Sequence, residues 1–188
     1  MPYVISRFNK NLTGFITYTM SKPMIIDSPY PTTDGIKNDA LSLQIVSPAY
    51  STSVGELNAI LQYVYHSFYF YKHGFKDYAE TLMSISKAEM IHLDILGKTI
   101  FALGAAPVFA QYPSTGFNFY STKYVAYSNT LKHMLEDDLI GERRAIADYN
   151  KMLRCLKNKQ VATIISRIVE DEKLHVAALE EILKECKC

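Results

Sequence analysis

The sequence contains no tryptophan, and its three cysteines do not form a C-x-x-C pair. Cys155, Cys186 and Cys188 therefore indicate neither a zinc ribbon nor a disulfide framework, and we expect the terminal thiols to be reduced. Strong charge of either sign is also missing, because the formal net charge is +1 and no basic run stands out. This balance argues against nucleic acid and against a membrane surface as partners.

A long hydrophobic run is missing as well. The longest uncharged stretch, Thr99 to Thr122, contains Pro107, Pro113 and many polar residues, so it cannot form a membrane-spanning helix. Residues 1–20 lack the continuous apolar segment of a secretory signal. We therefore expect a cytoplasmic protein.

Hydrophobic residues make up 48% of the 188 residues, which is enough for one substantial core. Helical periodicity dominates the chain, with a kink expected at Pro48 and an end at Gly104. The helical patterns cover about residues 39–71, 75–103, 125–156 and 159–184.

The connection between the second and third patterns is about twenty residues long, "AAPVFAQYPSTGFNFYSTKY". A loop of this length is uncommon in a compact domain unless it crosses the whole bundle or serves a function. The other connections are short. The sequence therefore predicts an all-α four-helix bundle over residues 39–188, built from two hairpins joined by a long crossover.

Residues 1–38 have a different character. The stretch "GFITYTM" has the composition of a strand, and "SPYPTTDG" is rich in turn residues. We expect this segment to form an extended N-terminal arm that packs on the bundle or on a neighbouring subunit.

Two short motifs, "KAEMIHL" and "VEDEKLH", carry a glutamate three residues before a histidine. The pairs are Glu89 with His92 and Glu172 with His175. In the second motif, the apolar stripe of the helix runs through the same face as Glu172 and His175, so both side chains are expected to point into the core.

An inward-facing glutamate on the preceding helix accompanies each pair. Glu56 is followed seven residues later by Tyr63, and Glu142 is followed seven residues later by Tyr149. Seven residues return to the same helix face, so each tyrosine lies two turns from its glutamate. The chain thus consists of two half-repeats with the same order of functional residues.

Four carboxylates and two imidazoles inside one bundle need compensating charge, because each buried ion costs several kcal/mol. Two divalent cations would balance the four carboxylates, and oxygen and imidazole donors suit them. A single Glu-x-x-His is typical of a solvated helix face, but two matched pairs favour metal binding. We assign no metal role to His66 or His133, because neither shares the face of the glutamate on its helix, and none to His73, because it lies at a helix end.

With these motifs, residues 39–185 resemble the ferritin-like dimetal-carboxylate superfamily, which includes bacterioferritin, the rubrerythrin diiron domain and manganese catalase. The stretches "AILQYVY", "HLDILGK" and "GERRAIADY" are similar to those of small clostridial-type rubrerythrin-like proteins. The resemblance implies a ferritin-like four-helix bundle. It also implies six metal ligands, namely Glu56, Glu89, His92, Glu142, Glu172 and His175.

The same resemblance implies that Tyr63 and Tyr149 donate hydrogen bonds to ligating carboxylates. Asp171 matches a carboxylate that orients a ligating histidine of the facing helix, whereas Ala88 stands at the equivalent place in the other half and cannot do so. Ala145 replaces the seventh carboxylate of rubrerythrins, and the cysteines of a rubredoxin-type site are missing. A conventional rubrerythrin peroxidase with its own electron-transfer module is therefore not expected.

The resemblance implies a dimetal redox protein that reduces or disproportionates hydrogen peroxide or dioxygen in oxidative-stress defence. We expect two divalent metal ions, iron in preference to manganese, an unidentified electron donor, and a homo-oligomer. Two alternatives remain open. One is ferritin-type oxidation and storage of iron, and the other is a spore-coat-like structural bundle without catalysis.

Overall fold

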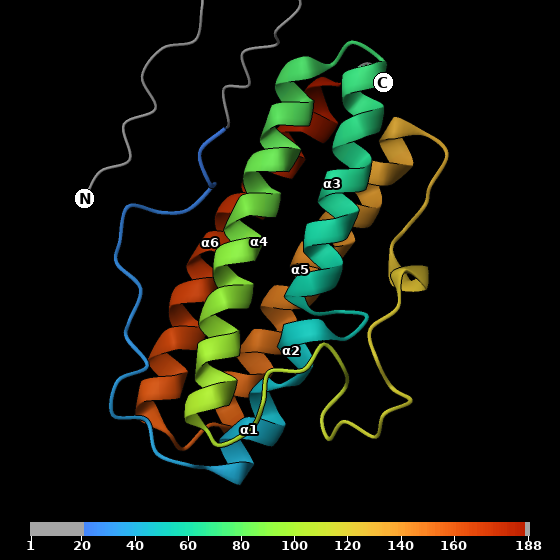
Figure 1. The fold of residues 1–188 in the computed structure, drawn as a ribbon. Helices are drawn as coiled ribbons and strands as arrows, with labels where there is room; N and C mark the ends of the chain where they lie inside the picture. Colours follow the sequence, from blue (N-terminus) through green and yellow to red (C-terminus); the bar gives the residue numbers. More distant parts are fainter. Residues whose placement is uncertain (1–20, 187–188) are drawn as a thin grey trace, which may run out of the picture.

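Four long helices form the body of the protein, a computed structural model in which residues 21–186 are described (Figure 1). Two antiparallel hairpins lie side by side, so that the first helix of each hairpin neighbours the other, and so do the second helices. The prediction of an all-α four-helix bundle made of two hairpins is confirmed. The helices are α3 (Glu56–Lys72), α4 (Lys76–Ala102), α5 (Leu131–Cys155) and α6 (Lys159–Glu185).

The first helical pattern is divided into three pieces, α1 (Ala40–Val46), α2 (Pro48–Ser51) and α3. The break at Pro48 matches the predicted kink, but a second break before α3 was not predicted. Its cause is Gly55, because a Cβ at this position would lie only 2.6 Å from the Ala49 carbonyl oxygen. This close approach fixes the start of α3, and Glu56 is its first residue.

The third helix begins at Leu131 rather than at Val125, so the predicted start is wrong by six residues. The Thr130 hydroxyl caps the helix by accepting a hydrogen bond from the His133 N–H. The preceding residues serve the crossover instead: Thr122–Tyr124 form a short 3-10 helix, η1, and the Ala126 N–H donates to Gln62 Oε1 at 3.1 Å. The crossover thus ends along α3 before α5 starts.

The described part of the N-terminal arm, residues 21–39, contains neither helix nor strand. It runs along α4 and α6 on the side away from the crossover (Figure 1). The Met24 N–H donates to the Ser84 carbonyl of α4 at 3.0 Å, and Arg167 of α6 donates to the Ser28 carbonyl at 2.9 Å. The strand-like stretch "GFITYTM" lies outside the described residues.

Apolar side chains form two core clusters that lie toward opposite ends of the bundle. On α4, Ile85 belongs to one cluster and Leu96 to the other; on α6, Leu179 and Ile168 divide in the same way. Glu89, His92, Glu172 and His175 occupy the helix turns between these residues. The two clusters therefore enclose a polar layer at mid-height of the bundle.

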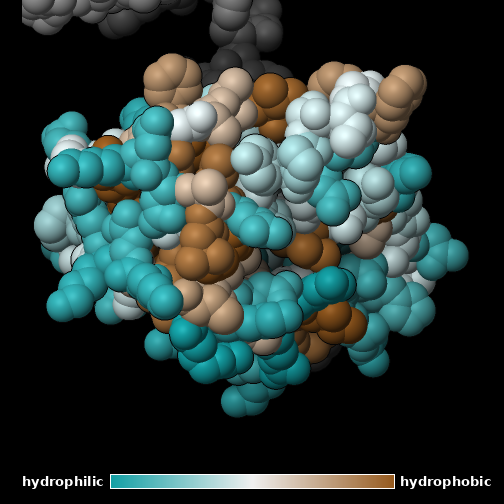
Figure 2. Space-filling view, turned by 90° about the horizontal axis from the view of Figure 1, so that it is seen from below, coloured by the Kyte–Doolittle hydropathy of each residue, from teal (hydrophilic) through white to brown (hydrophobic). Residues whose placement is uncertain are grey.

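One end of the bundle carries exposed hydrophobic groups, which appear brown among teal hydrophilic ones in Figure 2. Helix α1 and the end of α4 contribute Leu41 and Phe101, which are 52% and 71% exposed. Large exposed apolar groups favour association with another surface. The homo-oligomer nevertheless stays a prediction.

The thiols differ from one another. Cys155 is free and exposed, whereas Cys186 is disulfide-bonded, so the expected reduced thiol at Cys186 is wrong. Spacing along the chain gives no distance between sulfur atoms, and this distance decides whether a disulfide forms. Cys188 lies outside the described residues. Throughout residues 21–186, every helix is too short or too polar to cross a membrane.

The close packing at Gly55 predicts that Gly55→Ala lowers the free energy of unfolding by about 1–3 kcal/mol, because the added methyl group displaces α2 or α3. Gly141→Ala is the matched control, since a Cβ there meets no atom within 4 Å. That change should raise helix stability by about 0.5–1 kcal/mol. Denaturant unfolding of both variants measures the difference, and equal effects would contradict the packing argument.

Candidate metal centre

All six residues predicted as metal ligands lie together in the polar layer, and each helix contributes to it. Every one of them is buried, with at most 4% of its surface exposed. Helix α3 contributes one glutamate, as does α5, while α4 and α6 each contribute a Glu-x-x-His pair. The residues form two groups that could each hold a metal ion. One group is Glu56, Glu89, His92 and Glu172, and the other is Glu89, Glu142, Glu172 and His175.

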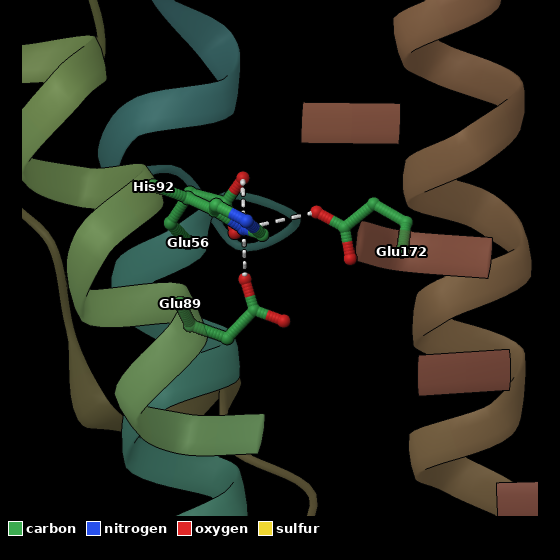
Figure 3. A group of neighbouring side chains, drawn as sticks. All are labelled: Glu56, Glu89, His92 and Glu172. Atoms are coloured by element: carbon green, nitrogen blue, oxygen red, sulfur yellow. Dashed lines mark hydrogen bonds and ion pairs between the residues drawn. The ribbon is translucent and has the colours of Figure 1, made fainter. Parts of the chain in front are cut away.

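The first group surrounds the Nδ1 atom of His92 (Figure 3). This nitrogen lies 2.9 Å from Glu89 Oε2, 3.2 Å from Glu172 Oε1 and 4.0 Å from Glu56 Oε1. The glutamates come from three different helices and point toward one centre. Such convergence of buried oxygen and nitrogen atoms is what a cation site requires.

The second group surrounds the Nδ1 atom of His175 in the same manner. This nitrogen lies 3.1 Å from Glu89 Oε1, 3.2 Å from Glu172 Oε2 and 3.6 Å from Glu142 Oε2. Glu89 and Glu172 thus present one oxygen to each group. The geometry suits these two as bridging carboxylates, with Glu56 and Glu142 as terminal ones.

Protons alone leave this cluster incompletely satisfied. Each imidazole Nδ1 carries at most one proton, yet it faces three carboxylate oxygens. Two buried oxygens, Glu89 Oε1 and Glu172 Oε1, have no hydrogen-bond partner, although each lies close to an imidazole nitrogen. Their contacts have ion-pair distances without hydrogen-bond geometry. The donor set therefore fits a pair of divalent cations.

The electrostatics also separate the two shared glutamates, Glu89 and Glu172, from Glu56 and Glu142. Burial and the charges of Glu89 and Glu172 raise the pKa of Glu56 well above its usual range, and the pKa of Glu142 rises for the same reasons. Burial would also raise the pKa of Glu89, but the imidazoles of His92 and His175 outweigh it and lower that pKa. Without metal, protons must therefore supply the charge balance that two cations would supply.

The two tyrosines donate to the terminal carboxylates across the half-repeats. Tyr63 of the first half donates to Glu142 Oε1, and Tyr149 of the second half donates to Glu56 Oε1. Burial and the nearby carboxylates raise the pKa of both phenols well above the usual range, so both keep their protons. The predicted role as donors agrees with the geometry, but the crossed pairing was not evident from the seven-residue spacing.

Asp171 lies behind His92, as expected from the resemblance. Its Oδ2 atom is 3.2 Å from His92 Nε2, and it also pairs with Arg167 Nη1 at 2.7 Å. Two groups of the arm add to this contact: the Ile26 N–H donates to Oδ1 at 2.8 Å, and the Tyr30 hydroxyl donates to Oδ2. Burial would raise the pKa of Asp171, but these partners lower it to about 2.

The other half lacks this carboxylate, because Ala88 stands at the equivalent place. The arm replaces it with a backbone group: His175 Nε2 lies 2.9 Å from the Met24 carbonyl oxygen. Both histidines therefore present Nδ1 to the cluster and have Nε2 fixed from outside, which sets the ring orientation. Met24 could not be predicted from the sequence, since every residue has a backbone carbonyl group.

A buried triad that was not predicted from the sequence lies between α3 and α5. His66 Nδ1 is 2.9 Å from Asp138 Oδ1, Gln62 Nε2 donates to the same oxygen at 2.8 Å, and His66 Nε2 lies 2.8 Å from the Ala126 carbonyl oxygen. These contacts attach the end of the crossover to α3 and α5. His66 belongs to neither group of possible metal ligands. Asp138 lies one turn before Glu142, and this spacing was the available signal.

A cavity of about 630 Å³ opens between α3 and α5 and reaches the glutamates of the cluster. On the opposite side of the bundle, the arm covers the seam between α4 and α6. A small molecule can therefore approach the cluster from the α3/α5 side.

Residues 53–188 match the ferritin-like domain that defines the ferritin family. The chain belongs to this family. No curated protein sequence is significantly similar to this ferritin-like protein. The family match begins after the arm, so Met24, Ile26 and Tyr30 lie outside the shared region.

Solved structures with the same fold include a manganese catalase from Anabaena, with a TM-score of 0.71 and 20% sequence identity over 86% of this chain and 80% of that one. Bacterioferritin BfrA of Mycobacterium tuberculosis has a TM-score of 0.66 and 24% identity over 79% of this chain and 87% of that one. A mycobacterial bacterioferritin has a TM-score of 0.65 and 27% identity over 79% and 86%. This ferritin-like protein thus shares its bundle with proteins named for manganese chemistry and for iron.

The contact between Tyr30 and Asp171 predicts that Tyr30→Phe weakens metal binding about tenfold while the fold is kept, because Asp171 and His92 lose a fixed orientation. Titration of the metal-free protein with Fe(II) or Mn(II) measures the affinity. Tyr71→Phe is the control, since Tyr71 is 62% exposed on α3. Equal affinities in the two variants would show that the arm does not position the histidine.

Proposed function

We propose that this ferritin-like protein binds two redox-active metal ions, iron in preference to manganese, and uses them to reduce or disproportionate hydrogen peroxide or to reduce dioxygen. The observation that carries the proposal is the pair of ligand groups that share Glu89 and Glu172. Shared carboxylates keep two cations close enough to act on one small molecule. We extend the proposal to a cytoplasmic role in oxidative-stress defence.

A metal pair of this kind, when bound, supplies the electrons that are exchanged with peroxide or dioxygen. The chain's own residues provide the surroundings. Tyr63 and Tyr149 hold the terminal carboxylates and keep their protons within the site. Asp171 and the Met24 carbonyl fix the two imidazoles, so the ligands are oriented before a substrate arrives.

The cluster of glutamates is accessible from one side of the bundle. The arm blocks the α4/α6 seam with hydrogen bonds to both helices, while the cavity between α3 and α5 leads to Glu56 and Glu142. Water and peroxide can therefore exchange on the side of the terminal carboxylates. The arm covers the side of the histidines.

Oxidation and storage of iron is the second candidate. The specific observation in its favour is the 27% identity to a mycobacterial bacterioferritin over 79% of the chain. The manganese catalase of Anabaena, at 20% identity, shows only that the fold is shared. These activities would use the same ligands, so they can be distinguished only by the products that they form.

Turnover of the metal-loaded protein tests the proposal. Protein purified without oxygen is expected to contain two metal ions per chain by elemental analysis, and it should consume peroxide. Disproportionation releases one dioxygen for two peroxides without a reductant, whereas reduction consumes two electrons per peroxide and releases none. Oxidation of many Fe(II) ions per chain, with little peroxide consumption, would favour storage. Metal-loaded protein that performs none of these reactions would favour the structural bundle.

Glu172→Ala should remove one or both metal ions and the peroxide turnover, because Glu172 belongs to both ligand groups. Glu170→Ala is the matched control, since Glu170 is exposed on the same helix. Elemental analysis and a peroxide assay check both. If Glu172→Ala keeps two ions and full turnover, the bridging role is wrong.

Metal removal should lower the melting temperature, because the binding energy of the cations contributes to folding. Replacement of both bridging acids, Glu89→Leu with Glu172→Leu, should give an inactive bundle whose melting temperature no longer depends on a chelator, since apolar replacement of buried charges is often neutral or stabilising. Thermal unfolding with and without chelator measures both effects. A wild-type protein that melts at the same temperature in either condition would contradict this.

A further inference from the structure

The cavity between α3 and α5 is larger than peroxide requires. Its volume is about 630 Å³, many times the volume of about 30 Å³ that one water molecule takes in the liquid. Cavities of 300–1,000 Å³ are typical for organic ligands of moderate size. The space therefore fits a second, organic substrate beside the small oxidant.

The cavity joins an apolar wall to the acidic cluster. Ile45, Val54, Ala59, Ala145 and Met152 are among its apolar lining residues, and Glu56, Glu89, Glu142 and Glu172 form its deep part. Hydroxyl groups also line it, from Tyr63, Tyr124 and Tyr149. An apolar wall with a few convergent polar groups is characteristic of a binding site for small organic molecules.

The charges outside the cluster indicate a neutral ligand. Arg144 and Lys151 line the cavity together with Asp137 and Asp148, and the remaining acid, Asp138, is paired with His66, so the signs balance. Arg144 and Asp148 also pair with each other at 3.6 Å. Because these charges balance, they would not attract a charged ligand strongly, and they do not disfavour the entry of a neutral one.

We propose that this cavity binds a neutral two-electron organic donor of the hydroquinone class, which reduces peroxide at the metal centre. The inference rests on the peroxide-reducing branch of the proposed function and names its electron donor. In the overall reaction the hydroquinone loses two electrons and two protons and becomes the quinone. Peroxide gains both, its O–O bond breaks, and two water molecules form.

Direct access to the cluster explains how such a donor replaces an electron-transfer protein. The cavity reaches all four glutamates of the two ligand groups. Outside this cluster, the described residues contain no group of possible metal ligands that could relay electrons from a protein partner. A donor inside the cavity would need no relay.

The test measures quinone formation from benzene-1,4-diol and peroxide by the metal-loaded protein. Ala145→Phe fills the cavity, and Ala147→Phe is the matched control, because Ala147 is exposed on the same helix and does not line the cavity. Gly141→Leu is a second filling variant for the case that Ala145→Phe does not fold, since a Cβ at Gly141 meets no atom within 4 Å. Hexaammineruthenium(II), an outer-sphere donor that needs no pocket, drives peroxide reduction in parallel.

The expected result is saturable quinone formation by the wild type, with a KM for the diol that rises at least about tenfold in the filled variants and stays unchanged in Ala147→Phe. Turnover with the ruthenium complex should stay within about twofold of the wild-type rate in all three variants. Equal diol kinetics in wild type and filled variants would overturn the inference. Turnover with ruthenium but not with the diol, or dioxygen release without any donor, would also overturn it while leaving the proposed function intact. Absence of peroxide turnover with any donor in the wild type would overturn the inference. If the protein also fails to reduce dioxygen, the proposed function would be overturned as well.

Discussion

Four carboxylates buried at mid-height of one bundle are the constraint on which the rest of the structure depends. Each of them would cost several kcal/mol if left uncompensated, and they repel one another. The two imidazoles, two phenols and the shared positions of Glu89 and Glu172 are arranged around this charge. Apolar clusters above and below the polar layer hold the four helices at the separation that brings the carboxylates together. The polar layer thus lies between two apolar cores.

The two long non-helical segments divide the surroundings of the centre between them. The arm lies over α4 and α6 and binds the outer nitrogen of His175 directly and that of His92 through Asp171. The crossover lies on the side of α3, held through Gln62 and His66 at its end, and leaves a cavity beside the terminal carboxylates. One side of the centre is therefore covered by the arm, and the other is open. The cluster is therefore accessible from the side of α3 and α5.

The half-repeats are related closely, but the residues around them are not. Asp171 orients one histidine and a backbone carbonyl orients the other, because Ala88 cannot accept a hydrogen bond through its side chain. The arm compensates for this difference, although it lies before the region that matches the ferritin-like domain. A part of the chain outside the family's shared region thus completes a site that lies inside it.

The sequence by itself determined the helical bundle and the hairpin pairing, and it predicted the six residues that meet in the polar layer, because helical periodicity and the repeated Glu-x-x-His spacing are local properties of the chain. It did not determine the start of α5, since a capping residue at Thr130 competes with helical composition from Val125 onward. Only the tertiary structure decided the crossed pairing of Tyr63 with Glu142 and of Tyr149 with Glu56. It also decided the contact of Met24 with His175 and the burial of His66 against Asp138. These are contacts between residues far apart in the chain, and no spacing rule fixes which side chains meet when four helices pack.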